Sequence, residues 1–298
     1  MSEAIIQADN LVKIYKTKDI EVVALQGLDL TVNKGELMAI IGSSGSGKST
    51  FLNMIGGLDK PSAGKLYVDG KNLFQMSEKE LVDYKRQDVG FVWQNNGRNL
   101  LPYLSAFDNI MMPMELNSFK EKKERAEMLL DMVGLSHKKN NRMQEMSGGE
   151  QQRIAIAIAL ANSPKVLLAD EPTGSVDTKT SNYIFDIFRR FNEELGVTIV
   201  IVTHDVGLSK KVQRVAAIRD GKISSERILK EDFQERVKNH GKEGFDWHEA
   251  DSQDEFAILD RAGRIQLPHE ALAELGLKDN KVRIVVKDGK VLLENPEG

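Results

Sequence analysis

Short apolar runs that end in polar residues recur along the chain. The run "ELMAII" (36–41) precedes a glycine-rich loop and then "KSTFLNMI", an order that predicts a strand, a loop and a helix. The runs "KVLLADEP" (165–172) and "VTIVIVTHD" (197–205) are aliphatic or β-branched, and both end in polar residues. Buried parallel strands have this form because they present chemistry at their carboxyl ends. The pattern therefore predicts an α/β fold.

An apolar stripe with helical spacing separates the last two runs. It consists of Ile184, Phe185, Ile187, Phe188 and Phe191. Residues with this spacing share one face of a helix, so we expect a helix that packs on the sheet.

The regular pattern fades after "RVAAIRDGKISSE" (214–226). Residues 239–255 are polar, acidic and glycine-containing, which is typical of a linker. His240 and His248 within this stretch are candidate metal ligands, although isolated histidines of a linker are more often solvated. We divide the chain into a first domain (1–235), a linker (236–255) and a second domain (256–298).

The second domain has a pattern of its own. It predicts a strand, a turn at Gly263, a strand, a helix that begins at Pro268 and ends near Gly276, and a hairpin that turns at Asp288-Gly289. At 43 residues, this unit is close to the limit below which a chain cannot bury enough core alone. We therefore expect it to dimerise.

Composition restricts the class of protein. A chain of 298 residues exceeds the common size of one domain, which agrees with a large domain and a smaller one. The net charge of -4 gives no general attraction to nucleic acids or anionic lipids, and no apolar run approaches the roughly 20 residues of a membrane-spanning helix. Neither a secretory signal pattern nor cysteine is present. We expect a cytoplasmic protein that reaches a membrane only through a partner.

The glycine-rich loop carries the strongest chemical signal. Residues 42–49 match G-x-x-x-x-G-K-[ST] between a strand and a helix, the context in which this motif binds phosphates. Backbone N–H groups and the positive end of the helix would surround the phosphates, Lys48 would reach the β- and γ-phosphates, and the Ser49 hydroxyl would bind Mg²⁺. The predicted nucleotide-binding residues of the loop are Gly42, Ser43, Ser44, Gly45, Ser46, Gly47, Lys48, Ser49 and Thr50.

Further polar positions follow predicted strands. Asp170 and Glu171 end the run "VLLA", where adjacent side chains point in different directions. Asp170 therefore suits the magnesium shell and Glu171 suits polarising an attacking water. His204 ends another strand and is a candidate contact to the γ-phosphate, and Gln94, after "VGFVW", is a candidate metal ligand.

A second anion-binding feature lies in "MSGGEQQR" (146–153), where a serine and two glycines open a predicted helix. The ordered set of phosphate loop, Gln94, "MSGGE", "LLADEP", "GSVD" and "VTHD" resembles the nucleotide-binding domain of an ABC transporter over residues 4–230. The stretches "GSSGSGKSTFLNMIGGLDKPSAG" and "NLLPYLSAFDNI" are most similar to the MacB/LolD/FtsE type. The resemblance implies a P-loop ABC ATPase fold with a mixed sheet and a helical subdomain, ATP and Mg²⁺ as cofactors, and hydrolysis of ATP to ADP and phosphate.

The resemblance also implies roles for single residues. Tyr15 matches the aromatic residue that stacks on adenine, and Asp177 matches a loop aspartate that communicates across a dimer. In the family two cassettes bind head to tail, so the helix start would cap the γ-phosphate held by the other subunit. The implied sets are Glu171, His204 and Gln94 for catalysis, Ser49, Gln94 and Asp170 for the metal, and Ser147, Gly148, Gly149 and Glu150 for the contact in trans.

The partners implied by this resemblance are a second copy of the chain and a separately encoded transmembrane permease of the FtsX/MacB type. The chain would lie at the inner face of the cell membrane, held there as a peripheral subunit by the permease. The apolar stretch "NIMMPMEL" (109–116) is a candidate contact for that permease, and core packing explains it nearly as well.

The second domain resembles the AbrB/SpoVT swapped-hairpin family in "LDRAGRIQLP" and "ALAELGL". Members of that family are commonly DNA-binding dimers. Residues 256–298 contain seven Lys or Arg against seven Asp or Glu, and DNA affinity depends on neutralising phosphates, so DNA binding by this domain is disfavoured. The resemblance instead implies a small, β-rich dimerisation domain that would tether two ATPase domains.

Two other functions stay open at this point. One is an ABC ATPase that regulates transcription or DNA maintenance, with the second domain as its DNA module; the chain has neither a long coiled coil nor a second cassette to favour it. The other is a mechanotransmission system that moves no solute and drives a periplasmic or surface partner.

Overall fold

The computed structural model describes residues 3–18, 20–94, 99–115, 121–174, 176–205, 207, 211–230, 253–267, 269–276 and 282–295. The strands are β1 (Ala4–Lys16), β2 (Glu21–Asn33), β3 (Leu37–Ile41), β4 (Ala63–Val68), β5 (Lys71–Asn72), β6 (Val89–Val92), β7 (Val166–Asp170), β8 (Thr198–Val202), β9 (Arg214–Arg219), β10 (Lys222–Leu229), β11 (Gln253–Ala257), β12 (Arg283–Lys287) and β13 (Lys290–Glu294). The helices are α1 (Lys48–Ile55), α2 (Glu78–Gln87), α3 (Ala106–Glu115), α4 (Lys122–Met132), α5 (Gly148–Ala159), α6 (Thr178–Leu195) and α9 (His269–Glu274), with 3-10 turns at Ser136–Lys138 and Met143–Glu145.

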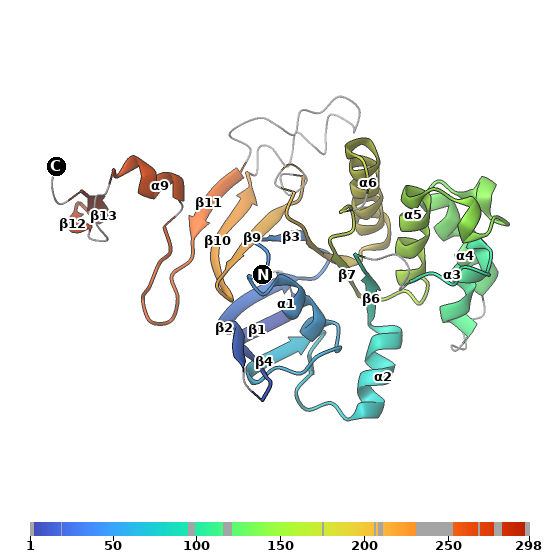
Figure 1. Cartoon of the computed structure of the whole chain (residues 1–298), viewed down its shortest axis with the longest axis horizontal. Coiled ribbons are helices and arrows are strands. Elements are labelled where there is room, and N and C mark those ends of the chain that lie inside the picture. The colour runs from blue at the N-terminus through green and yellow to red at the C-terminus, as the bar shows by residue number, and fades with distance from the viewer. Residues whose placement is uncertain are drawn as a thin grey trace.

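A seven-stranded mixed sheet is the centre of the fold, in the order β11-β10-β9-β3-β8-β7-β6 (Figure 1). The strands from β9 to β6 pair in parallel, whereas β10 and β11 are antiparallel additions at one edge. Three of the parallel strands are the apolar runs predicted from the sequence. Their carboxyl ends therefore meet at one edge of the sheet, where the candidate site lies.

Successive side chains along these strands point to opposite faces of the sheet, and each face has its own hydrophobic core. On β3, Leu37 and Ala39 join the first core, whereas Met38 and Ile40 join the second. Helices α3 to α6 cover the first core, and α1 with the four-stranded sheet covers the second. Both faces of the central sheet are thus buried, which is why its strands read as continuous apolar runs.

Helix α6 confirms the predicted apolar stripe. The stripe is buried in the first core, and the helix begins after Asp177, whose carboxylate accepts a hydrogen bond from the Thr180 N–H. The helix ends at Gly196, which has a φ of 65°. An aspartate before the first turn and a left-handed glycine after the last are ordinary start and stop signals.

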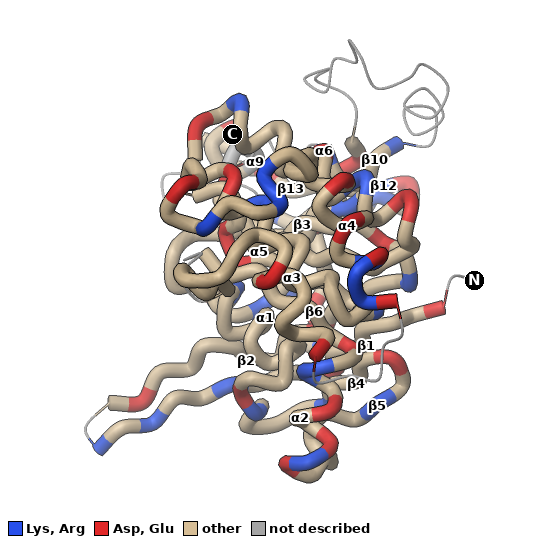
Figure 2. Tube along the Cα trace, turned by 90° about the vertical axis from the view of Figure 1, so that its right-hand side faces the viewer, with Lys and Arg blue, Asp and Glu red and all other residues tan. Residues whose placement is uncertain are grey.

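A second, antiparallel sheet has the order β2-β1-β4-β5. The long β1–β2 hairpin projects from the body of the molecule, and residues of both charges occur along its strands (Figure 2). On β1 and β2, Tyr15 is the register partner of Val22. The hairpin therefore brings an aromatic and an aliphatic side chain to neighbouring positions beside α1.

The helical subdomain of α3, α4 and α5 lies at the end of the molecule opposite β11 (Figure 1). Asn109 on α3 is almost fully buried, and its amide nitrogen donates to the carbonyls of Leu101, Leu104 and Ser105 while its oxygen accepts from the Leu101 N–H. A buried amide with this many partners holds the segment before α3 in place.

The boundary of the predicted linker differs from the structure. Residues 253–255 belong to β11, which pairs with β10, although we assigned them to the linker. Their polar composition gave no signal because β11 is an edge strand, whose pairing depends on backbone groups rather than on apolar side chains. The rest of the predicted linker up to residue 252, with His240 and His248, lies outside the described residues.

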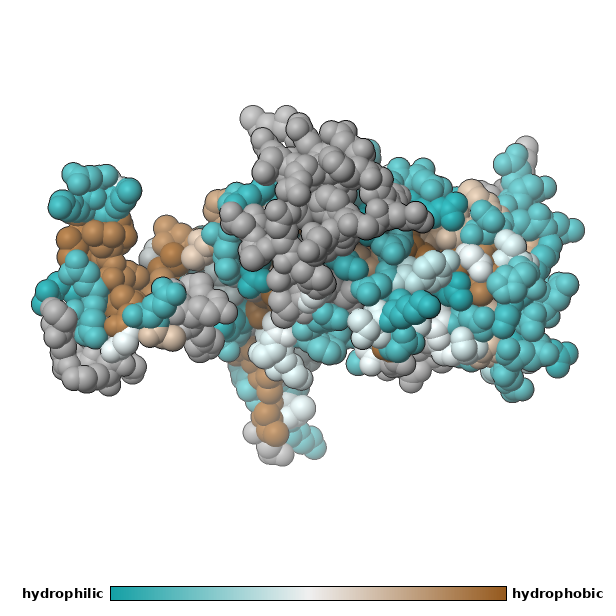
Figure 3. All heavy atoms as spheres, turned by 90° about the horizontal axis from the view of Figure 1, so that it is seen from above, coloured by the Kyte–Doolittle hydropathy of each residue, from teal (hydrophilic) through white to brown (hydrophobic). Residues whose placement is uncertain are grey.

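Most of the remaining elements of the second domain follow the predicted order, but the strand predicted after Gly263 is present only as a single bridge at Ile265. A turn at Gly263 brings Leu259 and Ile265 into a bridge, α9 follows, and β12 and β13 form a hairpin that turns at Asp288-Gly289. Pro268, the predicted helix start, lies outside the described residues. Apolar side chains gather on this end of the molecule (Figure 3), and Ile284, Val286 and Val291 are all exposed.

Candidate functional site

The phosphate loop joins β3 to α1, as the sequence predicts. Gly42 and Gly47 have φ values of +155° and +108°. A Cβ atom at Gly42 would lie 2.3 Å from the Ile218 carbonyl oxygen, and one at Gly47 would lie 2.6 Å from that of Ala24. Only glycine fits at these two positions, so the loop can wrap closely and leave its backbone N–H groups accessible.

Side chains of the loop are arranged for an anion. Lys48 is buried, and its ammonium group donates to the carbonyl oxygens of Gly42 and Ser43 at 2.9 Å each. The Ser46 hydroxyl is buried and has no partner among the described residues. A buried cation and an orphaned hydroxyl in a glycine cradle fit the phosphates of a nucleotide.

Asp170 at the end of β7 faces Ser49 at the start of α1. The Ser49 hydroxyl donates to Asp170 Oδ1 at 3.1 Å. Burial raises the pKa of Asp170; the Ser49 hydrogen bond opposes this shift, and the neighbouring Glu171 charge adds to it. Two oxygen donors at this distance, one of them an aspartate that is costly to ionise alone, fit a magnesium ion.

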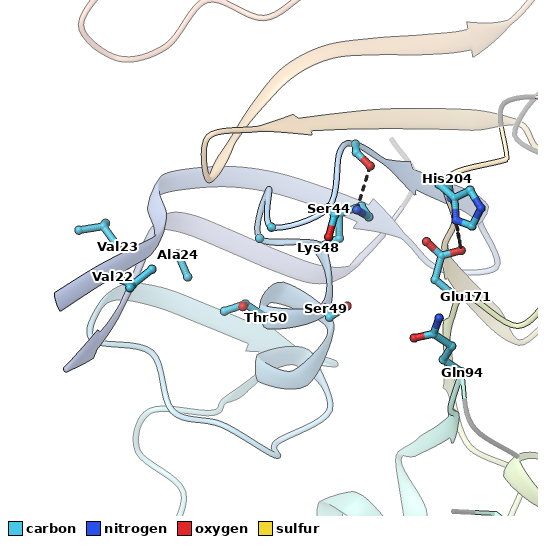
Figure 4. A pocket seen from close by; sticks show the side chains of 13 residues that line it. Val22, Val23, Ala24, Ser44, Lys48, Ser49, Thr50, Gln94, Glu171 and His204 are labelled. Carbon is cyan, nitrogen blue, oxygen red and sulfur yellow. Dashed lines mark hydrogen bonds and ion pairs between the residues drawn. The ribbon is translucent and has the colours of Figure 1, made fainter. Parts of the chain in front are cut away.

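Glu171 and His204 lie together at the carboxyl ends of β7 and β8 (Figure 4). His204 Nδ1 is 2.9 Å from Glu171 Oε2, and the Glu171 backbone N–H donates to the Val202 carbonyl. The Glu171 side chain is 13% exposed, whereas that of His204 is 73% exposed. The carboxylate is therefore held at the wall of the site, and the imidazole can meet a ligand.

Glu171 and His204 line one cavity of about 410 Å³, whereas Asp170 is not among its lining residues (Figure 4). Besides Glu171 and His204, its walls include Gln94, which follows β6, and most of the phosphate loop. The cavity also contains residues that the sequence analysis missed, namely Val22, Val23 and Ala24 of β2. The sequence analysis could not identify these residues, because their place at the cavity depends on the register that sets Val22 beside Tyr15.

Tyr15 is not among the residues that line this cavity, although its register partner Val22 is. The Tyr15 hydroxyl donates to Asp59 Oδ2 at 2.7 Å, and the Lys13 ammonium lies 4.7 Å from the centre of the ring. Burial, followed by the contact with Asp59, raises the pKa of Tyr15. The ring is thus fixed at its hydroxyl end, and its register partner Val22 lies at the cavity wall.

The start of α5 has a different environment. Ser147 caps the helix by accepting from the Glu150 N–H, and the Glu150 carboxylate accepts from the Ser147 N–H at 2.8 Å. Glu150 also pairs with Lys138 at 2.9 Å, and its pKa is lowered mainly by the Ser147 backbone N–H. None of the residues 147–150 lines the phosphate-loop cavity as described. The start of α5 therefore lies outside the cavity that the phosphate loop lines.

Asp177 is placed next to this turn rather than in the cavity. Its carboxylate accepts from the backbone and hydroxyl of Thr180, and the hydrogen bond from the Thr180 hydroxyl is the largest cause of its lowered pKa. A Cβ atom at Gly149 would lie 2.6 Å from Thr180 Cγ2. The starts of α5 and α6 are thus in contact.

The stretch "NIMMPMEL" was explained either as a contact for the permease or as core packing. Within the described part, 109–115, Ile110 and Met114 are buried in the first core. Met112 is 53% exposed, and Tyr103, just before α3, is 67% exposed. Core packing therefore accounts for one face of α3, and a second face stays available.

Comparisons with known proteins agree with this geometry. The sequence model described as "ABC transporter" matches residues 25–174. The lipoprotein-releasing system ATP-binding protein LolD of Idiomarina loihiensis is 40% identical over 76% of this chain and 99% of its own length, and LolD 1 of Chlorobium chlorochromatii is 43% identical over 72% and 87%. The macrolide export ATP-binding/permease protein MacB of Syntrophobacter fumaroxidans is 41% identical over 74% of this chain but only 31% of its own length.

Solved structures give the same relationship. The ATP-binding cassette MJ0796, in a dimeric post-hydrolysis state bound to ADP and Pi, aligns with a TM-score of 0.69 at 38% identity, covering 76% of this chain and 99% of that one. No helix in the described parts of the chain is long and apolar enough to cross a membrane. The phosphate loop, its cavity and these relatives establish that the chain belongs to the ABC transporter family, as an ATP-binding subunit that hydrolyses ATP.

Proposed function

We propose that the chain is the ATPase subunit of a transport complex, works as a head-to-tail homodimer and drives a separately encoded permease of the FtsX/MacB type. The observation that carries the proposal is the separation of the two anion-binding turns. Ser147 caps α5, away from the cavity that Lys48 and the rest of the loop line. Two copies placed head to tail would bring each turn to the other's loop.

The names of relatives support the wider assignment. LolD is named for lipoprotein release, MacB joins ATP-binding and permease functions in one longer protein, and the MJ0796 cassette is a dimer. A chain of this kind would be a peripheral subunit at the cytoplasmic face of the cell membrane. The exposed face of α3, with Met112, and the nearby Tyr103 offer an apolar surface for the permease.

We assign separate tasks to the residues of the site. Ser49, Asp170 and Gln94 would hold Mg²⁺, which when bound neutralises charge on the phosphate oxygens. Lys48 would exchange its two carbonyl partners for phosphate oxygens, and an adenine would rest on Tyr15 and Val22. Glu171 would accept a proton from the attacking water, with its carboxylate oriented by His204.

The tail (residues 253–298) would add a second means of dimerisation through its β12–β13 hairpin, as the resemblance to the AbrB/SpoVT swapped-hairpin family implies. Ile284, Val286 and Val291 of its hairpin are exposed, as expected for apolar residues that become buried against a second copy of the chain. The balanced charge of this region disfavours DNA as the occupant.

The direct test uses Glu171→Gln. Removing the base should lower the turnover of ATP by about 10²- to 10⁴-fold, roughly 3–5 kcal/mol of barrier. Sedimentation of this variant with ATP should show a stable dimer, because binding is retained while hydrolysis is blocked.

Gly148→Glu in the same background is the matched control. A Cβ atom at Gly148 meets no atom within 4 Å, so the fold tolerates a side chain there. The new charge would repel the partner's γ-phosphate, so the double variant should bind ATP with its cassettes apart, and any dimer that is left should be the nucleotide-independent dimer of the tail. Turnover in Gly148→Glu at the wild-type rate, independent of protein concentration, would contradict the head-to-tail site.

The partner is tested by purifying the Glu171→Gln chain from its native cells with ATP and mild detergent, followed by mass spectrometry. Recovery of a polytopic permease supports the transport proposal. Recovery of DNA or soluble regulators, without a membrane protein, would contradict it and favour a regulatory ATPase. A permease whose reconstituted complex hydrolyses ATP but moves no solute would indicate mechanotransmission.

A further inference from the structure

The first segment of the tail, residues 253–267, is built into the catalytic domain. Residues Gln253–Ala257 form β11 and pair with Ser225–Leu229 of β10, and the Ile258 backbone N–H donates to the Ser224 carbonyl. Ile258 also packs against the second core. We call residues 253–267 the docked segment. Backbone pairing and an apolar contact fix its start on the sheet.

The turn of the docked segment reaches a different sheet. Arg261 contacts Asp9 of β1 and lies 3.0 Å from Asp29 of β2. These side chains are partly exposed, so each pair alone contributes little. Their position is the informative feature, because one guanidinium joins the docked segment to both strands of the hairpin that borders the nucleotide cavity.

Asp260 ties the same turn to the β9–β10 connection. Lys222 donates to Asp260 Oδ2 at 3.1 Å, and Asp260 Oδ1 accepts from the backbone N–H groups of Ala262 and Arg264. The Arg264 backbone N–H is the largest cause that holds the pKa of Asp260 well below its ordinary value. Asp260 therefore stays ionised while it orders the turn and holds Lys222.

The β9–β10 connection is in turn bonded to the phosphate loop. The Gly221 N–H donates to the Ser46 carbonyl at 3.0 Å, and the Gly221 carbonyl accepts from the Gln26 N–H at 3.0 Å. Gly221 has a φ of +71°, and a Cβ atom there would lie 2.7 Å from the Ala24 carbonyl. The turn is therefore hydrogen-bonded to the phosphate loop and packed closely against β2.

The docked segment also approaches the loop directly. A cavity of about 280 Å³ is lined by Gly42 and Ser43 of the loop and by Gln266 and Leu267 at the far end of the docked segment. The segment thus meets the loop's surroundings at three places: the β1–β2 sheet, the β9–β10 turn and this shared cavity.

We propose that the docked segment holds the phosphate loop of the same chain in its binding conformation. Asp260 and Arg261 would act as positioning residues that set the affinity for ATP. A phosphate loop binds best when its N–H groups are already in place, since ordering them on binding costs conformational entropy. The docked segment restrains the two neighbours of the loop and so keeps it ordered. Because coupling between sites is reciprocal, nucleotide binding should strengthen the docking by the same factor.

A charge exchange between Asp9 and Arg261 tests the proposal. Asp9→Arg and Arg261→Glu should each raise the Kd for ATP by about two- to tenfold, the range of coupling carried by residues that touch no ligand. The kcat at saturating ATP should not change. Combining the two substitutions restores an ion pair of opposite sense at position 9 but leaves Asp29 without its guanidinium partner, so the Kd should return part of the way toward the wild-type value.

Lys290→Glu on the exposed β13 is the matched control, since it alters the charge of the tail outside the docked segment, and its Kd should equal that of the wild type. The proposal is overturned if both single variants bind ATP as tightly as the wild type, or if the double variant binds as weakly as the singles.

A measurement on the unaltered chain covers the case in which a variant fails to fold. Saturating ADP should slow amide hydrogen exchange in β10, β11 and residues 258–267, and should leave exchange in β12 and β13 unchanged. Equal exchange in the docked segment with and without ADP would also overturn the proposal.

Discussion

At the scale of single residues, the site contains two residues at the end of β7 whose conformation or charge opposes folding. Glu171 has a φ of 47°, a conformation that costs a non-glycine residue on the order of 1 kcal/mol. Asp170 is a carboxylate whose ionisation is opposed by burial. Sites for cations and phosphates are often less stable when empty, because their charges are arranged for the ligand.

We predict that Asp170→Asn stabilises the nucleotide-free chain and lowers ATPase turnover. The folded-state pKa of Asp170 is raised above its ordinary value of 3.8, so the ionised side chain opposes folding at neutral pH. Below pH 3.8 the group is neutral in both states and the cost disappears. The rise in Tm should therefore grow between pH 3.8 and the raised pKa, level off above it and vanish in acid.

Thermal unfolding of both proteins across this pH range measures the effect, and the asparagine oxygen can still accept from Ser49. Asp131→Asn, at an exposed position of α4, is the control and should show no such pH profile. A stabilisation that is the same in acid and at neutral pH would contradict the assignment to ionisation.

At the scale of elements, helices α5 and α6 begin in contact. Gly149 leaves room for Thr180, whose hydroxyl donates to Asp177 Oδ2 at 2.7 Å. The turn that we assign to the partner's phosphate and the loop aspartate therefore share one packing contact within the chain. A shift of one helix start would move the other.

We predict that Gly149→Ala destabilises the chain by about 1–3 kcal/mol, as overpacking does. The new methyl group would meet Thr180 Cγ2, so Thr180→Ser, which removes that carbon and keeps the hydroxyl, should recover most of the loss. Denaturant unfolding of the two single variants and the double variant gives the interaction energy. Equal losses in Gly149→Ala with and without Thr180→Ser would show that the contact is not the cause.

At the scale of the whole molecule, the central sheet separates two ends with different surfaces. The helical subdomain lies at one end, and the tail lies at the other with its exposed apolar side chains (Figures 1 and 3). Because β11 is docked on β10, a tail dimer would tether the cassettes through the short segment after residue 267 rather than through the whole predicted linker. Such a tether raises the effective concentration of one cassette near the other.

We predict that Val286→Asp with Val291→Asp abolishes self-association of the nucleotide-free chain. The two valines are register partners on β12 and β13, and both are exposed, so the charges would oppose burial against a second copy. Light scattering over a range of concentrations measures the change, with Lys79→Asp on α2 as control. ATP binding should be unaffected. A wild-type chain that is monomeric at every concentration without nucleotide would contradict the tail dimer.

Most of the features that could be predicted from the sequence depend on residues that are close together in the chain. The phosphate loop, the strands before Asp170 and His204, and the buried face of α6 each depend on residues close together in the chain. Val22 and Val23 were missed because their place in the cavity depends on the register of β1 with β2. The docking of β11 was missed for a related reason, since its polar residues pair through the backbone with a strand that precedes the linker.

The β10–β11 pairing also has a consequence for any attempt to produce the catalytic domain alone. A chain that ends before residue 253 would leave the outer backbone groups of Ser225–Leu229 open to solvent. An open strand edge is a template for other chains, and shortened preparations would tend to aggregate and precipitate. A useful cut therefore falls after Leu267, which keeps β10 paired with the polar edge strand β11 and removes the hairpin of β12 and β13.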